Sequence, residues 1–238
     1  MSLPSLVALA AASLLVAGPL AAQTPLPVDA KELVPHRDSL VVLVSGQPRG
    51  ASVTSLAKSG AGFSYHEQTA IGTFMEQTTT VQLSPVGAAK SVSQSGMARG
   101  IPGSIEISYA GDRVSGKVQA VTVDGPNAFS VDTTVPAGVV DDNSLQALLP
   151  ALPWAEGAGW VFPMYSAGTN SVTTMTLRVV GIQTAMVPAG AFEAYRAELT
   201  GGNTDVAFLI LKRKPHTVLM IETTGAPIRF ELASGGGL

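Results

Sequence analysis

The sequence contains no cysteine, which excludes disulfides, thiolate metal sites, a cysteine nucleophile and lipid attached to an N-terminal cysteine. Charged residues are also scarce, at 13% of the 238 residues, roughly half the share usual in soluble domains. The net charge of −3 provides no positive field that would recruit nucleic acid. Aromatic residues amount to only 5%, so a core must be built mainly from Val, Leu, Ile and Ala.

The N-terminal segment has no charged side chain before Asp29. Residues 5–18 form a continuous run of small and apolar residues, and a small-residue cleavage pattern ends at Ala22 or Gln23. This pattern predicts a signal peptide over residues 1–23 and therefore a secreted protein, periplasmic or extracellular. An uncleaved membrane anchor is the alternative, because about 18 apolar residues is the lower limit for a membrane span.

Proline and glycine positions divide the remaining chain. Three prolines predict an extended lead-in over residues 24–37, because a helix cannot accommodate them. We expect residues 38–234 to form a single β domain. Its two halves, about 38–123 and 158–233, are joined by residues 124–157, in which strand-like alternation is interrupted, and residues 150–165 are rich in Pro and Gly.

Alternating apolar positions predict the strands. Ile105, Ile107 and Tyr109 alternate with polar residues up to a Gly-Asp turn, after which the alternation returns. About a dozen such short runs predict a mostly β protein, an antiparallel meander curled into a half-barrel, barrel or sandwich. One short helix is expected after Asp141-Asp142-Asn143, which offers an N-cap before Leu145, Leu148, Leu149 and Leu152.

A tight turn is the clearest local signal in the C-terminal third. Pro188 presets the backbone angle of its first corner, and Gly190 can adopt the left-handed conformation that closes a hairpin. Strand-like runs flank it on both sides, from residues 176–180 and 191–199. The pattern predicts a structural turn and carries no chemistry of its own.

The residues around this turn resemble a known family. Residues 180–199, VGIQTAMVPAGAFEAYRAEL, are similar to the V-x-G-x-E-x-V-x-V-P-A-G-x-F-x-A-x-R-V-E hairpin of exported bacterial domain-of-unknown-function family 3108. Gln183 stands where that pattern has Glu. The resemblance implies a fold similar to the half-barrels of periplasmic lipoprotein carriers. It implies no catalytic residues.

Candidate catalytic and metal-binding patterns are incomplete. His66-Glu67 begins like the zinc-protease motif H-E-x-x-H, but Ala70 stands in the position of the second histidine. His36 and His216 are the other histidines, and no serine lies in a G-x-S-x-G motif. We therefore predict no metal, no cofactor and no catalytic residues. A hydrolase site assembled from distant residues stays open as an alternative.

One stretch concentrates large aromatic residues beside the predicted helix. Such a group can line the mouth of an apolar ligand site, or it can fill a solid core. The candidate ligand-binding residues are Leu145, Leu148, Leu149, Trp154, Trp160, Phe162 and Tyr165.

The resulting functional hypothesis is an exported, non-catalytic β-protein of the cell envelope that binds an apolar or lipid-like ligand. This step rests partly on analogy with the carrier half-barrels. The alternatives are a structural or protein-interaction module and the non-sequential Ser/His hydrolase. The expected partners are an apolar small molecule or lipid, not nucleic acid, with membrane contact left open but no span after cleavage. The sequence does not predict the oligomeric state.

Overall fold

The computed structural model describes residues 25–122 and 125–236. The signal peptide predicted for residues 1–23 lies outside these ranges and stays a prediction. No helix in the described ranges is long and apolar enough to cross a membrane.

The described chain forms one 15-stranded sheet, which is antiparallel except for the short β9–β10 pair. Its spatial order is β8-β7-β6-β5-β4-β3-β2-β1-β15-β14-β13-β12-β11-β10-β9, so nearly every strand pairs with its neighbour in sequence. The sheet does not close, because β8 and β9 are its two edges. This confirms the predicted mostly β antiparallel meander, and among the three predicted forms the open sheet corresponds to the half-barrel. The strands are β1 (His36–Val44), β2 (Gln47–Ser59), β3 (Gly62–Ile71), β4 (Met75–Leu83), β5 (Ala89–Ala98), β6 (Ile101–Ala110), β7 (Arg113–Thr122), β8 (Gly125–Thr134), β9 (Val140–Asp141), β10 (Gly159–Ser166), β11 (Ser171–Val187), β12 (Gly190–Thr200), β13 (Val206–Leu211), β14 (Val218–Thr223) and β15 (Ile228–Gly235).

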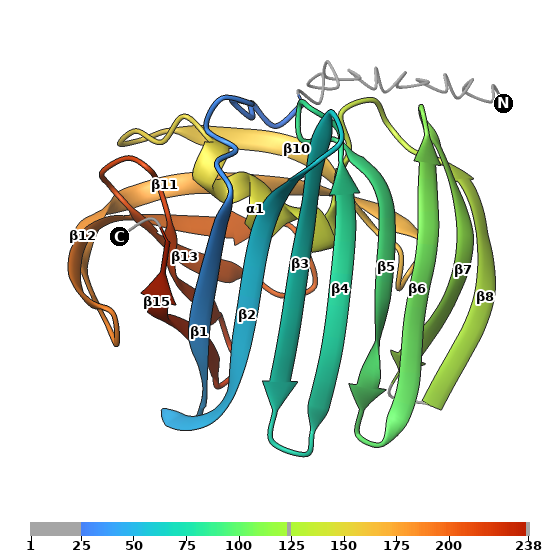
Figure 1. Ribbon diagram of the computed structural model, residues 1–238, viewed down its shortest axis with the longest axis horizontal. Coiled ribbons are helices and arrows are strands. Elements are labelled where there is room, and N and C mark those ends of the chain that lie inside the picture. The colour runs from blue at the N-terminus through green and yellow to red at the C-terminus, as the bar shows by residue number, and fades with distance from the viewer. Residues whose placement is uncertain (1–24, 123–124, 237–238) are drawn as a thin grey trace, which may run out of the picture.

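Strands β1 to β8 form a curved wall (Figure 1). Register places apolar residues side by side along its inner face: Tyr65 pairs with Val81, Val81 with Val92, and Val92 with Ile107. Each of these four is buried, whereas intervening residues such as His66 are exposed. Since side chains alternate between the two faces of a strand, this register buries one face of the wall.

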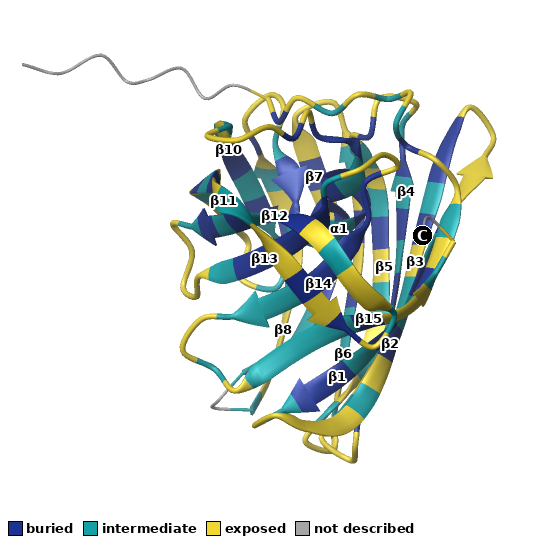
Figure 2. Ribbon diagram, turned by 90° about the vertical axis from the view of Figure 1, so that its left-hand side faces the viewer, coloured by how far each residue is buried: buried dark blue, intermediate teal, exposed yellow. Residues whose placement is uncertain are grey.

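The C-terminal strands β10 to β15 cross the concave side of the wall (Figures 1 and 2). Pairing of β15 with β1 joins the two parts into one sheet. The β11–β12 turn runs through Pro188, and Gly190 has φ of +135°, so the predicted left-handed turn is confirmed. Beneath this hairpin a second apolar cluster includes Ala185, Leu219 and Leu232.

The predicted connector is shorter than expected. Its first part, expected to be irregular, forms strand β8 (Gly125–Thr134), which pairs with β7 without any register shift. Pro126 is tolerated there because β8 is an edge strand, where one missing backbone donor can face solvent. The wall therefore extends to Thr134, and the connection between the halves occupies residues 135–158.

The predicted short helix is present inside this connection. A 3₁₀ turn (Asp142–Ser144), α1 (Leu145–Leu148) and a second 3₁₀ turn (Leu149–Ala151) follow one another. Asp141 caps the first turn by accepting a hydrogen bond from the Asn143 backbone, as the sequence indicated. A helix this short depends on tertiary burial, and Leu145 and Leu148 supply it.

The lead-in differs slightly from its prediction. Strand β1 begins at His36, so the extended segment covers residues 25–35 of the described chain, with one turn near Lys31. Leu26 and Leu33 are buried in the main core, and the backbone of Asp29 donates to the carbonyl of Ala151. The segment therefore packs across the end of the sheet that carries α1.

Candidate functional site

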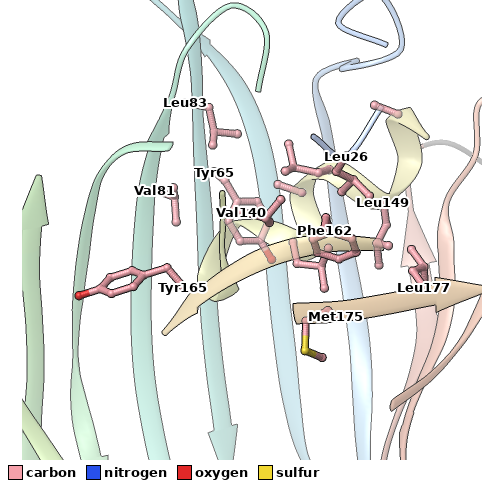
Figure 3. Packing of buried hydrophobic residues seen from close by; sticks show 14 of the residues in the cluster. Leu26, Tyr65, Val81, Leu83, Val140, Leu149, Phe162, Tyr165, Met175 and Leu177 are labelled. Carbon is pink, nitrogen blue, oxygen red and sulfur yellow. The ribbon is translucent and has the colours of Figure 1, made fainter. Parts of the chain in front are cut away.

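The residues predicted to bind a ligand lie mainly in the packed core. Phe162, Tyr165 and Leu149 have no exposed surface, and Leu145 is 6% exposed. Figure 3 shows Leu149, Phe162 and Tyr165 among the packed side chains of this cluster, with Leu26 and Tyr65 from distant segments. These buried side chains fill the end of the half-barrel that holds α1. Their role as ligand contacts stays a prediction that no contact in the structure tests.

The two tryptophans belong to the same packed end. Trp154 is 7% exposed, and its indole Nε1 donates to the carbonyl oxygen of Leu149 at 2.7 Å. Its ring meets Trp160 edge-on at 5.5 Å and stacks on Tyr195 at 6.3 Å. Trp160 is only partly buried. The apolar ring of Trp154 is thus packed against other aromatic rings, and its polar N–H has a hydrogen-bond acceptor.

Leu148 is the candidate residue that does line a hollow. It borders a small apolar cavity of about 200 Å³ beneath the lead-in, together with Leu26 and Val140. Val86, at the tip of the β4–β5 connection, also lines it and is 66% exposed.

Two carboxylates, the buried Asp141 and the half-buried Asp142, lie next to α1. Asp141 accepts from the Tyr109 hydroxyl at 2.5 Å and from the backbone and side chain of Asn143. Asp142 accepts from the Asn143 amide at 2.8 Å and from the Ser166 hydroxyl. These bonds attach the start of the helical segment to β6 and β10.

Burial changes the titration of this group. It raises the pKa of Asp141, and burial together with the charge of Asp141 raises the pKa of Asp142 to about 7. Burial and then the neighbouring aspartates raise the pKa of Tyr109 and bring the pKa of Tyr165 to about 12. Asp141 has no exposed surface, so its hydrogen bonds serve to hold together the packed end of the half-barrel that contains α1, called the plug here.

A second hollow lies farther along the wall, away from α1. This sheet hollow has a volume of about 370 Å³, within the range of small-molecule sites. On one side it is lined by the ends of strands β4 to β7 that are remote from α1. On the other side it is lined by the β10–β11 turn. The lining residues are Met75, Glu76, Gln77, Gln94, Gly96, Met97, Ala98, Gly103, Ser104, Ile105, Gln119, Ala120, Val121, Thr122, Gly168 and Thr169.

Small inward-facing residues create the sheet hollow. Gly96 and Ala98 lie on the same face of β5 as Val92, and Ala120 lies on the same face of β7 as Val118. The two valines are nearer to α1. At Gly96 a side chain is also excluded by packing, since a Cβ would lie 2.2 Å from the carbonyl oxygen of Glu76. These positions are not among the ligand-binding residues predicted from the sequence. Their signal was the change from large to small residues along alternating positions of consecutive strands.

One polar side chain links the sheet hollow to the α1 plug. The amide of Gln94 lines the hollow and donates to the Thr79 hydroxyl at 3.1 Å and to Asn143 Oδ1 at 2.9 Å. Both amide protons of Gln94 are thus engaged, whereas its amide oxygen can still accept a hydrogen bond. Gln77 lines the same side and also donates to Thr79. The hollow thus combines an apolar lining with amide groups on one side.

The histidines do not assemble a serine–histidine pair. His36 Nδ1 lies 2.9 Å from the carbonyl of Val34, and its Nε2 is 3.8 Å from Asp38, beyond hydrogen-bond distance. His216 Nδ1 lies 2.9 Å from the carbonyl of Leu211, and His66 Nδ1 lies 3.2 Å from Thr80 Oγ1 on the exposed face. None of the three bonds a serine within residues 25–122 and 125–236. The same ranges contain no cluster of three His, Asp or Glu residues able to hold a metal ion.

Comparison with known proteins places the chain by family and by fold. A family model described as "Protein of unknown function (DUF3108)" matches residues 67–233. No curated protein matches the sequence. A β-barrel-like protein of the domain of unknown function DUF1849 from Brucella abortus is similar in structure, with a TM-score of 0.54 at 11% identity over 87% of this chain and 98% of that one. This likeness is one of fold. A protein with a YmcC-like fold from Bacteroides fragilis aligns with a TM-score of 0.30 at 10% identity, over 84% of this chain and 94% of that one, and we draw nothing from it.

Proposed function

This chain belongs to the DUF3108 family, and from that premise we propose that it is an exported, non-catalytic protein that binds an apolar, lipid-like ligand in the sheet hollow. The observation that carries the proposal is the hollow of about 370 Å³ on the concave face, left by small residues between a packed plug and the ends of β4 to β7. Export rests on the predicted signal peptide.

The lining indicates the chemistry of the ligand. Met75, Ile105 and Ala120 offer apolar surface, which favours a hydrocarbon body. The amide oxygen of Gln94 can accept a hydrogen bond, so a hydroxyl or amine on the ligand would be held at that side. The proposed ligand is therefore amphipathic, with an apolar part and one hydrogen-bond donor.

Filling the sheet hollow tests this function. Ala120 lines it, and Ala128 lies on the neighbouring strand with its side chain exposed. Titration with the apolar fluorescent probe N-phenylnaphthylamine should show binding by the wild type and by Ala128→Phe. In Ala120→Phe the new ring occupies the site, and affinity should fall at least about tenfold.

Native mass spectrometry of the purified full chain provides a second measurement. A co-purified lipid in the wild type that is lost in Ala120→Phe would support the proposal. Equal probe affinity in all three proteins, with unchanged circular dichroism spectra, would refute binding in the sheet hollow.

A protein-interaction module is the second candidate, and strand β8 is the observation that favours it. It is a ten-residue edge strand that pairs with β7 without a register shift, and such an edge can accept a further strand. Replacing Ser130 with proline, near its centre, should abolish any interaction made this way and leave probe binding intact.

A further inference from the structure

We propose that the hairpin tips remote from α1 form a docking surface for a membrane with anionic headgroups. The surface, called the rim here, consists of Arg49, Phe74, Met97 and Arg99. It goes beyond ligand binding, because docking on a lipid surface does not require an occupied hollow.

Exposed apolar side chains are the first observation. Phe74, in the β3–β4 turn, is 51% exposed, and Met97, near the end of β5, is 53% exposed. Both belong to adjacent hairpins at the lower end of the wall in Figure 1. An exposed aromatic ring and a flexible thioether at projecting tips suit the interfacial layer of a bilayer, into which such side chains insert.

Two arginines flank this apolar tip. The Gly72 backbone donates to the carbonyl of Arg49 at 2.8 Å, and the Arg99 backbone donates to the carbonyl of Phe74 at 2.8 Å. These bonds hold one arginine on each side of the β3–β4 turn. Both arginines are exposed, and neither forms an ion pair with any residue of 25–122 or 125–236.

The charge of the rim fits lipid phosphate. The rim itself carries two cations, and Glu76, which pairs with Met97 in the β4–β5 ladder, is an exposed acid beside it. Guanidinium groups bind phosphate oxygens through paired hydrogen bonds. An apolar tip between two such groups is complementary to an anionic bilayer surface, in a protein whose net charge is otherwise −3.

The rim is continuous with the sheet hollow. Met97 belongs to both. Met75, which lines the hollow, directly follows Phe74 in the chain, and Ala98, which also lines it, directly precedes Arg99. The packed end with α1 lies at the other end of the wall (Figures 1 and 2). Docking through the rim would therefore bring the end of the hollow that is farthest from the plug against the lipid.

Vesicle flotation tests the proposal. The protein is purified from cells that express the full-length gene. It is then mixed with phosphatidylcholine vesicles that either contain or lack phosphatidylglycerol. We expect flotation with the mixed vesicles that weakens in high salt, because screening reduces attraction to the headgroups. Every variant carries the same N-terminus, so any contribution of residues 1–24 is constant.

Paired variants separate the rim from other exposed residues. Phe74→Ser with Met97→Ser should lower partitioning at least about tenfold, and each of Arg49→Gln and Arg99→Gln about fivefold. The matched control is Val86→Ser with Met186→Ser, at residues 66% and 72% exposed, which should bind as the wild type does.

Three outcomes would overturn the proposal. They are no flotation by the wild type, equal losses in rim and control variants, and a concentration-dependent dimer that is abolished by the rim substitutions, which would assign the rim to a second copy. Ala120→Phe should still float with the mixed vesicles, so a failure of ligand binding is distinguishable from a failure of docking.

Discussion

Replacing Trp154 with phenylalanine decides whether the aromatic stretch is core or ligand site. The indole N–H donates to the carbonyl of Leu149 at 2.7 Å, and the ring packs against Trp160 and Tyr195. Phenylalanine keeps an aromatic ring at this place but removes the donor. The Leu149 carbonyl would then be buried without this partner.

The expected loss of stability has two parts. The Leu149 carbonyl keeps the hydrogen bond that it accepts from the Leu152 backbone at 3.2 Å, so the substitution removes one hydrogen bond worth about 0.5–1.5 kcal/mol, and the smaller ring leaves a packing defect of about 1 kcal/mol. We expect the free energy of unfolding to fall by about 2 kcal/mol. For a domain of this size the melting temperature should fall by about 4–8 °C. Trp154→Ala would cost about 3–5 kcal/mol, a large part of the stability of a typical domain, so phenylalanine is the better probe.

Thermal unfolding followed by far-ultraviolet circular dichroism measures the effect, with N-phenylnaphthylamine titration in parallel. Val161→Ala is the control, because Val161 is 47% exposed and should change stability by no more than about 0.5 kcal/mol. An unchanged melting temperature in Trp154→Phe with weakened probe binding would refute the core assignment. It would show that this stretch lines a ligand site.

Three further predictions concern other parts of the chain. Gly190→Ala should lower stability by about 1 kcal/mol or more in urea titrations, because φ is +135° and the Phe192 ring lies 3.3 Å from the added Cβ; an unchanged midpoint would contradict this. Burial raises the pKa of Asp142 from 3.8 to about 7, so its ionisation destabilises the fold as pH rises through that interval. Asp142→Asn should therefore flatten the decline in melting temperature between these pH values, and an identical pH profile would show that Asp142 does not cause it. N-terminal sequencing of the exported protein should begin after Ala22 or Gln23, and soluble protein that begins at Met1 would contradict the predicted signal peptide.

Local patterns in the sequence were sufficient for the meander. The alternation at Ile105, Ile107 and Tyr109 and the turn at Pro188 and Gly190 depend on neighbouring residues, and β6, β7 and the β11–β12 turn follow them. The helix cap at Asp141 is likewise a contact between residues two apart. Such features are readable because the groups that stabilise them are close in the chain.

Strand β8 shows where local patterns fail. Gly125-Pro126 favours a loop when read alone, and only its position at the edge of the sheet makes the proline acceptable. The pairing of β1 with β15 is similarly invisible in the sequence, because it joins residues nearly a whole chain apart.

The order of residues along the chain is enough to predict which positions are apolar, which alternate and where the chain turns, and it shows the aromatic stretch. It does not predict that Phe162 and Tyr165 lie in a filled core and that a hollow forms beside Gly96 and Ala120 instead, which depends on the folded structure. The physical reason is that the space around a side chain depends on what covers it. At Tyr165 that cover includes Tyr109, and the centroids of the two rings are 6.3 Å apart. Tyr109 belongs to a strand more than fifty residues earlier in the chain, and no local pattern specifies such a neighbour.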